Sequence, residues 1–169
     1  MVWDQKGIPH KGWTCIGMID LGEDLDGVDA ESRRDYYETC QMCKHEGIRY
    51  VHIMQHPNYD LDLRVGQQCA ENMEEDYTNP KKRETSLKNK HNRRVNFMRK
   101  EWTRNKKGNF TLKYKGQHMT IMPSKFAGGG FGIIFNNESM WNIKGEKIKT
   151  FENAKAIAFT LLDNYLMES

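Results

Sequence analysis

The spacing of three cysteines constrains this chain more than any other feature of its sequence. Cys40 and Cys43 have two residues between them, and Cys69 follows after a stretch rich in strand-forming residues. Two thiolates at this spacing can bind one tetrahedral zinc ion from a single tight turn, here called the knuckle. The spacing therefore predicts a closed, structural zinc site in which Cys69 is the third ligand.

The residues between the knuckle and Cys69 favour a β-hairpin. Residues 48–56 and 61–65 have the composition of strands, and a turn-prone Pro-Asn-Tyr-Asp sequence joins them. A short helix is expected to begin at Cys69, where the positive end of the helix dipole favours a thiolate. A further strand is expected over residues 12–22, followed by an acidic loop that leads into a short helix.

A closed zinc site needs a fourth ligand. His56 is favoured, because it lies midway between the knuckle and Cys69 at the end of a hairpin strand, from which it could turn toward the metal. Cys15 also has a simple interpretation as a core residue of the first strand. The predicted ligands are Cys40, Cys43, His56 and Cys69, and the alternatives left open for the fourth position are His52, His45 and Cys15.

Other roles for the cysteines compete with zinc. Free cysteines are often buried as small apolar residues. A redox-active pair is disfavoured, because Cys40 does not follow a strand and open a long helix as in thioredoxin-like motifs. A zinc ion with four protein ligands has no open position for water, so a catalytic metal is not expected.

The remaining composition predicts a soluble, cytoplasmic protein. No apolar run approaches the roughly 20 residues that a membrane span needs, and the N-terminus lacks the apolar core of a secretion signal. Cytosolic thiols stay reduced, so the four cysteines are not expected to form disulfides.

The cysteine-containing region resembles a known group of proteins. Cys40-x-x-Cys43, His56-Pro57 and Val65-Gly66-x-x-Cys69-Ala70 are similar to small treble-clef or zinc-ribbon-like proteins of bacterial genomes and mobile elements. In a treble clef, a knuckle, a hairpin and a helix surround one zinc ion. The resemblance implies zinc and a bacterial or mobile-element setting, and it implies no activity.

The two halves of the chain carry opposite charge. Residues 1–78 contain 7 Lys or Arg and 16 Asp or Glu, whereas residues 79–169 contain 19 and 7. This asymmetry predicts an anionic partner for the second half, or attraction between the two halves.

A basic amphipathic helix is predicted over residues 84–102. Apolar residues from Leu87 to Trp102 recur at helical spacing, with His91 in the same stripe. The dense positive charge on the other faces suits the phosphates of DNA or RNA, and a solvated helix face is the alternative. The predicted nucleic-acid contacts are Lys88, Lys90, Arg93, Arg94, Arg99, Lys100, Arg104, Lys106 and Lys107.

Three strands and a final helix are expected after the basic segment. Residues 110–115, 118–122 and 131–135 have strand patterns, and residues 150–167 place apolar side chains on one broad helical stripe. This order is similar in outline to three-stranded DNA-binding domains of the integrase-arm type, without a shared residue motif.

The expected fold class is α+β. Residues 1–80 form a zinc-stabilised half with knuckle, hairpin and helix, residues 81–107 a basic linking helix, and residues 108–169 a three-stranded antiparallel sheet with one packed helix. The expected role is non-enzymatic nucleic-acid binding or regulation.

Two alternatives remain. One is a phage or plasmid inhibitor of a host nuclease or CRISPR complex, which acts by protein contact or uses the acidic residues 20–38 to mimic nucleic acid. The other is an HNH-like nuclease, suggested by His52, His56 and Asn72. The helix after Cys69 offers no histidine for the metal that such a nuclease needs.

Overall fold

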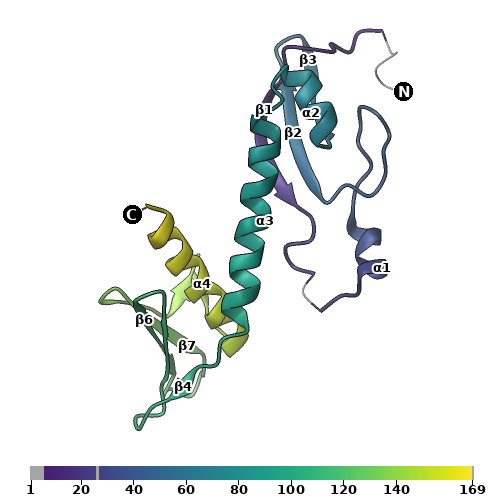
Figure 1. The fold of residues 1–169 in the computed structure, drawn as a ribbon. Helices are drawn as coiled ribbons and strands as arrows, with labels where there is room; N and C mark the ends of the chain where they lie inside the picture. The colour runs from purple at the N-terminus through teal and green to yellow at the C-terminus, as the bar shows by residue number, and fades with distance from the viewer. Residues whose placement is uncertain (1–5, 26, 169) are drawn as a thin grey trace. The chain divides into compact units, whose positions relative to one another are not determined.

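The computed structural model describes residues 6–25 and 27–168, and the chain forms two compact units that are divided after Asn92. The described ranges contain four α-helices and three antiparallel sheets, of three, five and two strands, which confirms the α+β class (Figure 1). The helices are α1 (Ala30–Arg33), the 3-10 turn η2 (Arg34–Tyr36), α2 (Gln67–Glu74), α3 (Asn79–Met98) and α4 (Phe151–Glu168). None of the helices in these ranges is long and apolar enough to cross a bilayer.

The sheet of the first unit has β2 in its centre, between β1 and β3. Its strands are β1 (Thr14–Asp20), β2 (Tyr50–His56) and β3 (Tyr59–Val65). The last two form the predicted hairpin, which turns at Pro57 and Asn58. His52 pairs with Val65 and Met54 with Leu63, so these four buried side chains lie on one face of the sheet.

Helix α2 packs against the sheet of the first unit and carries Cys69. Cys69, Ala70 and Met73 are buried at helical spacing and belong to one core with Trp13 and Met42. The helix begins two residues before the position expected from the sequence. Gly66 takes the extended N-cap conformation, which places Cys69 in the first turn.

Helix α3 also begins earlier than predicted, at Asn79. The carboxylate of Asp76 accepts the backbone N–H groups of Thr78 and Asn79, at 3.0 Å each, and so satisfies donors at the helix start. Pro80 then lies in the first turn, where its missing N–H costs no hydrogen bond. The proline is therefore part of the helix start.

The main sheet of the second unit has five strands where three were predicted. They follow the chain order: β4 (Thr103–Arg104), β5 (Phe110–Tyr114), β6 (Gln117–Pro123), β7 (Phe131–Phe135) and β8 (Glu138–Met140). The predicted strands are the central three. The edge strands β4 and β8 have two and three residues, which is too short for an alternating pattern. A separate ribbon is formed by β9 (Asn142–Ile143) and β10 (Glu146–Lys147).

One face of the five-stranded sheet forms the core of the second unit. Phe110, Ile121, Ile133 and Met140 lie directly opposite one another across four strands. The predicted final helix, α4, packs its buried stripe against this face, with Phe97 from the end of α3 fully enclosed in the same core. The other face of the sheet is left toward solvent.

Candidate metal centre and nucleic-acid interface

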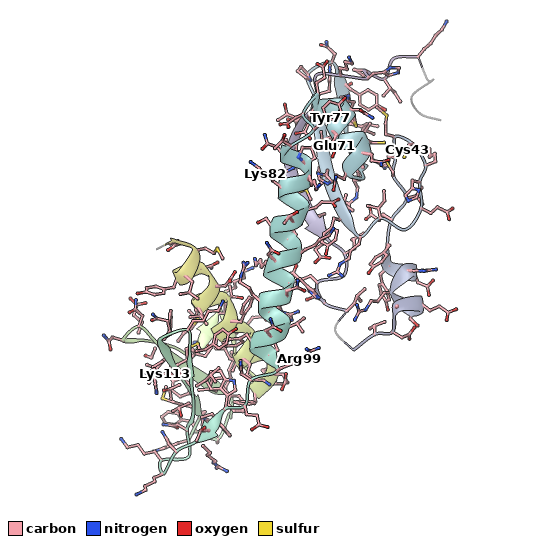
Figure 2. All side chains as sticks on the ribbon, in the orientation of Figure 1. Cys43, Glu71, Tyr77, Lys82, Arg99 and Lys113 are labelled. Atoms are coloured by element: carbon pink, nitrogen blue, oxygen red, sulfur yellow. The ribbon has the colours of Figure 1, made fainter. Side chains whose placement is uncertain are left out.

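The three predicted cysteine ligands come together in the first unit. The sulfur atoms of Cys40, Cys43 and Cys69 all lie within 4.8 Å of one another, and Figure 2 shows Cys43 beside helix α2. Thiolates bound to one tetrahedral zinc ion lie about 3.8 Å apart, because each Zn–S bond is about 2.3 Å long. The cluster therefore fits a metal ion of this size. No other metal-binding side chain of the described residues joins it.

Backbone hydrogen bonds hold the knuckle in shape. The N–H of Cys40 donates to the carbonyl of His45 at 2.8 Å, and the N–H of Lys44 donates to the carbonyl of Cys40 at 2.9 Å. Lys44 has a φ of 67°, a left-handed conformation that closes the turn. The knuckle is tied to β3 by the N–H of Gln41, which donates to the carbonyl of Arg64 at 2.9 Å.

The cluster favours negatively charged sulfur at Cys40. Its sulfur accepts hydrogen bonds from the Cys69 thiol and, against the effect of burial, from the backbone N–H groups of Cys43, Gly66 and Met42. Together these bonds lower the pKa of Cys40 to about 5. The pKa of Cys69 is raised by its hydrogen bond to Cys40, by burial and by the neighbouring charge. N–H donors aimed at a buried thiolate are suited to a metal-bound cysteine.

A pocket of about 770 Å³ opens beside the cysteines. Its wall contains all three of them together with His45, which follows the knuckle directly. Among the described residues, His45 is the one of the four candidates for the fourth ligand that lines this pocket. Its side chain is exposed and can change its rotamer without disturbing the core.

His56, the favoured fourth ligand, is not brought to the cysteine cluster. Its Nε2 atom donates to the carbonyl of Lys11 at 2.9 Å, and its Nδ1 atom accepts the N–H of Asn58 at 2.9 Å. The ring also packs on Trp13, with a centroid distance of 5.2 Å. Gly12 leaves room for the His56 ring, since a Cβ atom at position 12 would lie only 3.1 Å from that ring. Through these hydrogen bonds and ring contacts, His56 connects the segment before β1 to the hairpin turn.

The other two candidates lie together elsewhere. His52 is fully buried, with Nε2 3.1 Å from Oε1 of Glu84, and its ring hydrogen-bonds with the thiol of Cys15. Glu84 belongs to the part of α3 that lies in the first unit. No motif in the sequence signals this cluster, because its members are far apart in the chain.

Some predicted nucleic-acid contacts have partners within the protein. Arg93 forms a bidentate pair with the buried Asp163 of α4, at 2.7 and 3.1 Å, and so anchors α3 to α4 within the second unit. Lys88 lies 4.0 Å from Glu84 and 5.3 Å from the ring centroid of Tyr50. These contacts account for Arg93 and Lys88 without a phosphate. Arg94 is half-buried, and Lys90 is exposed.

The remaining predicted contacts lie on the second unit. Asn105 accepts the N–H groups of Lys107 and Asn109, at 3.0 Å each, which shapes the hairpin tip that carries Lys106 and Lys107. Arg104 lies 5.7 Å from the Phe110 ring centroid and Lys100 lies 5.5 Å from that of Tyr114.

Exposed cations outnumber exposed carboxylates on this unit. They are Arg99, Lys100, Arg104, Lys106, Lys107, Lys113, Lys115, Lys125, Lys144, Lys147 and Lys149, against Glu101, Glu138, Glu146, Glu152 and Glu168 (Arg99 and Lys113 are labelled in Figure 2).

The solvent face of the five-stranded sheet is mostly polar. Across all five strands the directly opposed residues of this face are Thr103, Thr111, Thr120, Ile134 and Ser139. The next row pairs Lys113 with His118. Trp141 lies over Gly132, where a Cβ atom would come within 2.6 Å of its ring. The face therefore combines hydroxyl groups, cations and one aromatic ring that is 40% exposed.

The residues behind the two alternative functions are dispersed. At the ends of the acidic segment, Asp20 pairs with Arg49 and Glu38 with Arg64, so these carboxylates are already neutralised. Asn72 accepts a hydrogen bond from Tyr77, and it does not share a site with His52 or His56, which have the separate partners described above.

Comparisons with protein-family models, curated proteins and solved structures found no significant match for this chain.

Proposed function

We propose that this protein binds nucleic acid through its second unit and that a structural zinc ion stabilises its first unit. The observation that carries the first part is the excess of exposed cations around a polar, open sheet face. The second part is supported by three convergent sulfur atoms. The order of knuckle, hairpin and helix around them suits a treble-clef zinc site.

Zinc is the metal best suited to the cysteine cluster. Thiolates are soft ligands that favour zinc over calcium or magnesium, and the knuckle supplies two of them from one turn. His45 is the proposed fourth ligand, because it lines the same pocket as the three cysteines. His56 is already held by Lys11 and Asn58. With His45 bound the zinc is closed to water, and its role is to hold the knuckle, the hairpin and α2 together.

The proposed nucleic-acid surface differs in part from the one expected from the sequence. Arg93 and Lys88 are removed from it, because each has a partner within its own unit. Lys113 and Lys115 of the β5–β6 hairpin are added, since both are exposed. The hydroxyl groups of the sheet face can donate to phosphates or base edges, and the cations supply the sequence-independent attraction.

Fluorescence anisotropy with labelled duplex and single-stranded DNA and RNA tests this proposal. The full chain should bind at about 50 mM salt, and the affinity should fall steeply as salt is raised. The double variant Lys106→Gln, Lys107→Gln should reduce the salt slope for a duplex by about 2, which corresponds to two lost phosphate contacts. Both lysines are exposed, so the change should leave the fold intact.

A matched control is the double variant Lys81→Gln, Lys82→Gln. It removes the same charge from two exposed residues of the first unit, and it should leave the salt slope within error of wild type. Absence of binding by the wild-type chain at low salt would overturn the proposed function. Equal effects of the two double variants would overturn the assignment of the surface.

A further inference from the structure

Trp141 presents an open aromatic face on the solvent side of the five-stranded sheet. A Cβ atom at Gly132 would lie 2.6, 2.7 and 2.8 Å from three neighbouring atoms of its six-membered ring, Cε2, Cδ2 and Cζ2. A point almost equidistant from three such atoms lies near the axis through the ring centre, so the indole lies flat over the glycine. One ring face is thus covered, and since Trp141 is still 40% exposed, the opposite face is open to solvent.

The backbone holds the ring in this position. Trp141 directly follows β8, and its carbonyl accepts the N–H of the buried Ile148 at 3.3 Å. The carbonyl of Ile148 in turn accepts the N–H of Phe131, at the start of β7, at 2.9 Å. A ring that is fixed before a ligand arrives loses little conformational freedom on binding.

The residues next to the ring form a small apolar patch. Ile134 lies two positions after Gly132 on the same face of β7 and is 36% exposed. Met122 pairs with Gly132 on the other side. Ile134 also pairs with Ser139 and Thr120, which belong to the row of hydroxyl groups across the sheet. The patch therefore borders groups that can hydrogen-bond to a phosphate or a sugar.

The charge around this patch suits a polyanion. Lys147 is exposed and packs over the loop before β7, where a Cβ atom at Gly128 would lie 2.7 Å from its Nζ atom. Lys113 lies on the same sheet face as the hydroxyl row. None of the solvent-facing residues that the structure describes in these five strands is a carboxylate. They are Thr103, Thr111, Lys113, His118, Thr120, Met122, Gly132, Ile134 and Ser139.

The same charge disfavours a second copy of this chain as the occupant. Two such faces placed against each other would bring lysines together without carboxylates between them, and like charges in close apposition repel. A nucleic acid strand instead supplies phosphates for the lysines and an aromatic base for the open ring.

We propose that this sheet face binds single-stranded nucleic acid, with one base stacked on Trp141 and adjacent phosphates on Lys147 and the hydroxyl row. This inference rests on the proposed function and narrows its ligand. Stacking on an aromatic ring accepts any base, because every base has a π-face. In a duplex the base faces are covered by neighbouring base pairs, so a duplex has only the phosphate contacts of this surface.

Fluorescence anisotropy on the zinc-loaded full chain at about 50 mM salt tests the inference. The probes are labelled single strands of about 12 nucleotides, as DNA and as RNA, and the DNA duplex of the same sequence. Trp141→Leu should weaken binding of both single strands by about tenfold and should change duplex affinity by less than about twofold. Tyr77→Leu is the control, since it removes a ring that is 65% exposed in the first unit. It should change neither affinity.

A second measurement decides the matter if Trp141→Leu fails to fold. Trp141→Phe keeps a smaller ring over Gly132 and should retain more single-strand affinity than the leucine variant. Saturating single strand should quench part of the tryptophan fluorescence of the wild-type chain. That part should be missing in Trp141→Phe, and the duplex should not produce it.

The outcomes separate this inference from the proposed function. If wild type binds neither single strands nor the duplex, both proposals fall together. If wild type binds but Trp141→Leu has no effect, or weakens duplex and single strands equally, base stacking is refuted while nucleic-acid binding stands. Sedimentation without nucleic acid examines the other occupant. A dimer that Trp141→Leu abolishes would assign the face to a second copy and overturn the inference.

Discussion

The Nε2 atom of His52 lies 3.1 Å from Oε1 of Glu84, and this contact joins the central strand of the first sheet to helix α3. Burial alone lowers the pKa of His52, but hydrogen bonds with Cys15 and Glu84 raise it above the usual value. A pKa raised by folding means that the folded state binds the proton more tightly. The resulting stabilisation is full below about pH 6.5 and is lost as the pH rises through the raised pKa.

We therefore expect His52→Gln to destabilise the protein more at about pH 6 than at about pH 9. Denaturant unfolding followed by circular dichroism gives the free energy of unfolding at each pH. Val51→Ala serves as a control, because Val51 is buried on the same strand and carries no charge. Its loss of stability should be the same at both values. A loss of stability in His52→Gln that is the same at both pH values, or larger at the higher one, would contradict a raised pKa of His52.

Removal of zinc is expected to lower the thermal midpoint by about 15 °C or more. A ligand present at a thousand times its dissociation constant stabilises by about 4 kcal/mol, and each kcal/mol moves the midpoint of a small domain by about 4–8 °C. Differential scanning calorimetry with and without a strong chelator measures the shift. Native mass spectrometry should find one zinc per chain in Cys15→Ser and none in the double variant Cys40→Ser, Cys69→Ser. A zinc increment that survives in the double variant would be incompatible with the proposed site.

The fourth ligand can be identified by cobalt substitution. His45→Gln should alter the visible ligand-field bands of the Co²⁺-loaded protein and weaken metal affinity by roughly tenfold or more. His56→Gln should leave these bands unchanged, because His56 is bonded to Lys11 and Asn58. The reverse result would restore His56 as the ligand. Absence of any Co²⁺ thiolate band in the wild type would instead argue against the metal site itself.

Loss of the Arg93–Asp163 pair should destabilise the second unit. Asp163 is 5% exposed, and Asp163→Ala leaves the guanidinium of Arg93 without its partner. We expect a cost of about 2–3 kcal/mol in the free energy of unfolding. The pair of Lys155 with Glu152, whose side chain is 73% exposed, offers a comparison, since Glu152→Gln should cost about 0.5 kcal/mol or less. Equal effects of the two changes would show that the buried pair has no special structural role.

Much of the fold could be predicted because its elements are encoded locally. The stripe of residues 150–167 identified α4, since helical periodicity depends on neighbours three and four positions apart. The hairpin turn at Pro57 and the knuckle spacing of Cys40 and Cys43 are likewise short-range signals. Errors arose where local rules conflict. The helix predicted from residue 84 begins at Asn79, because Pro80 in its first turn is compatible with a helix.

Short-range pattern thus established the α+β class, the central strands and the two cysteines of the knuckle. Tertiary structure alone decided which histidine shares a pocket with the cysteines, which arginine forms an ion pair with a buried aspartate, and which groups surround Cys15. These outcomes depend on strand register, on one β-bulge and on contacts such as that between Arg93 and Asp163, 70 residues apart. Packing of the whole chain determines them, and no window of neighbouring residues contains that information.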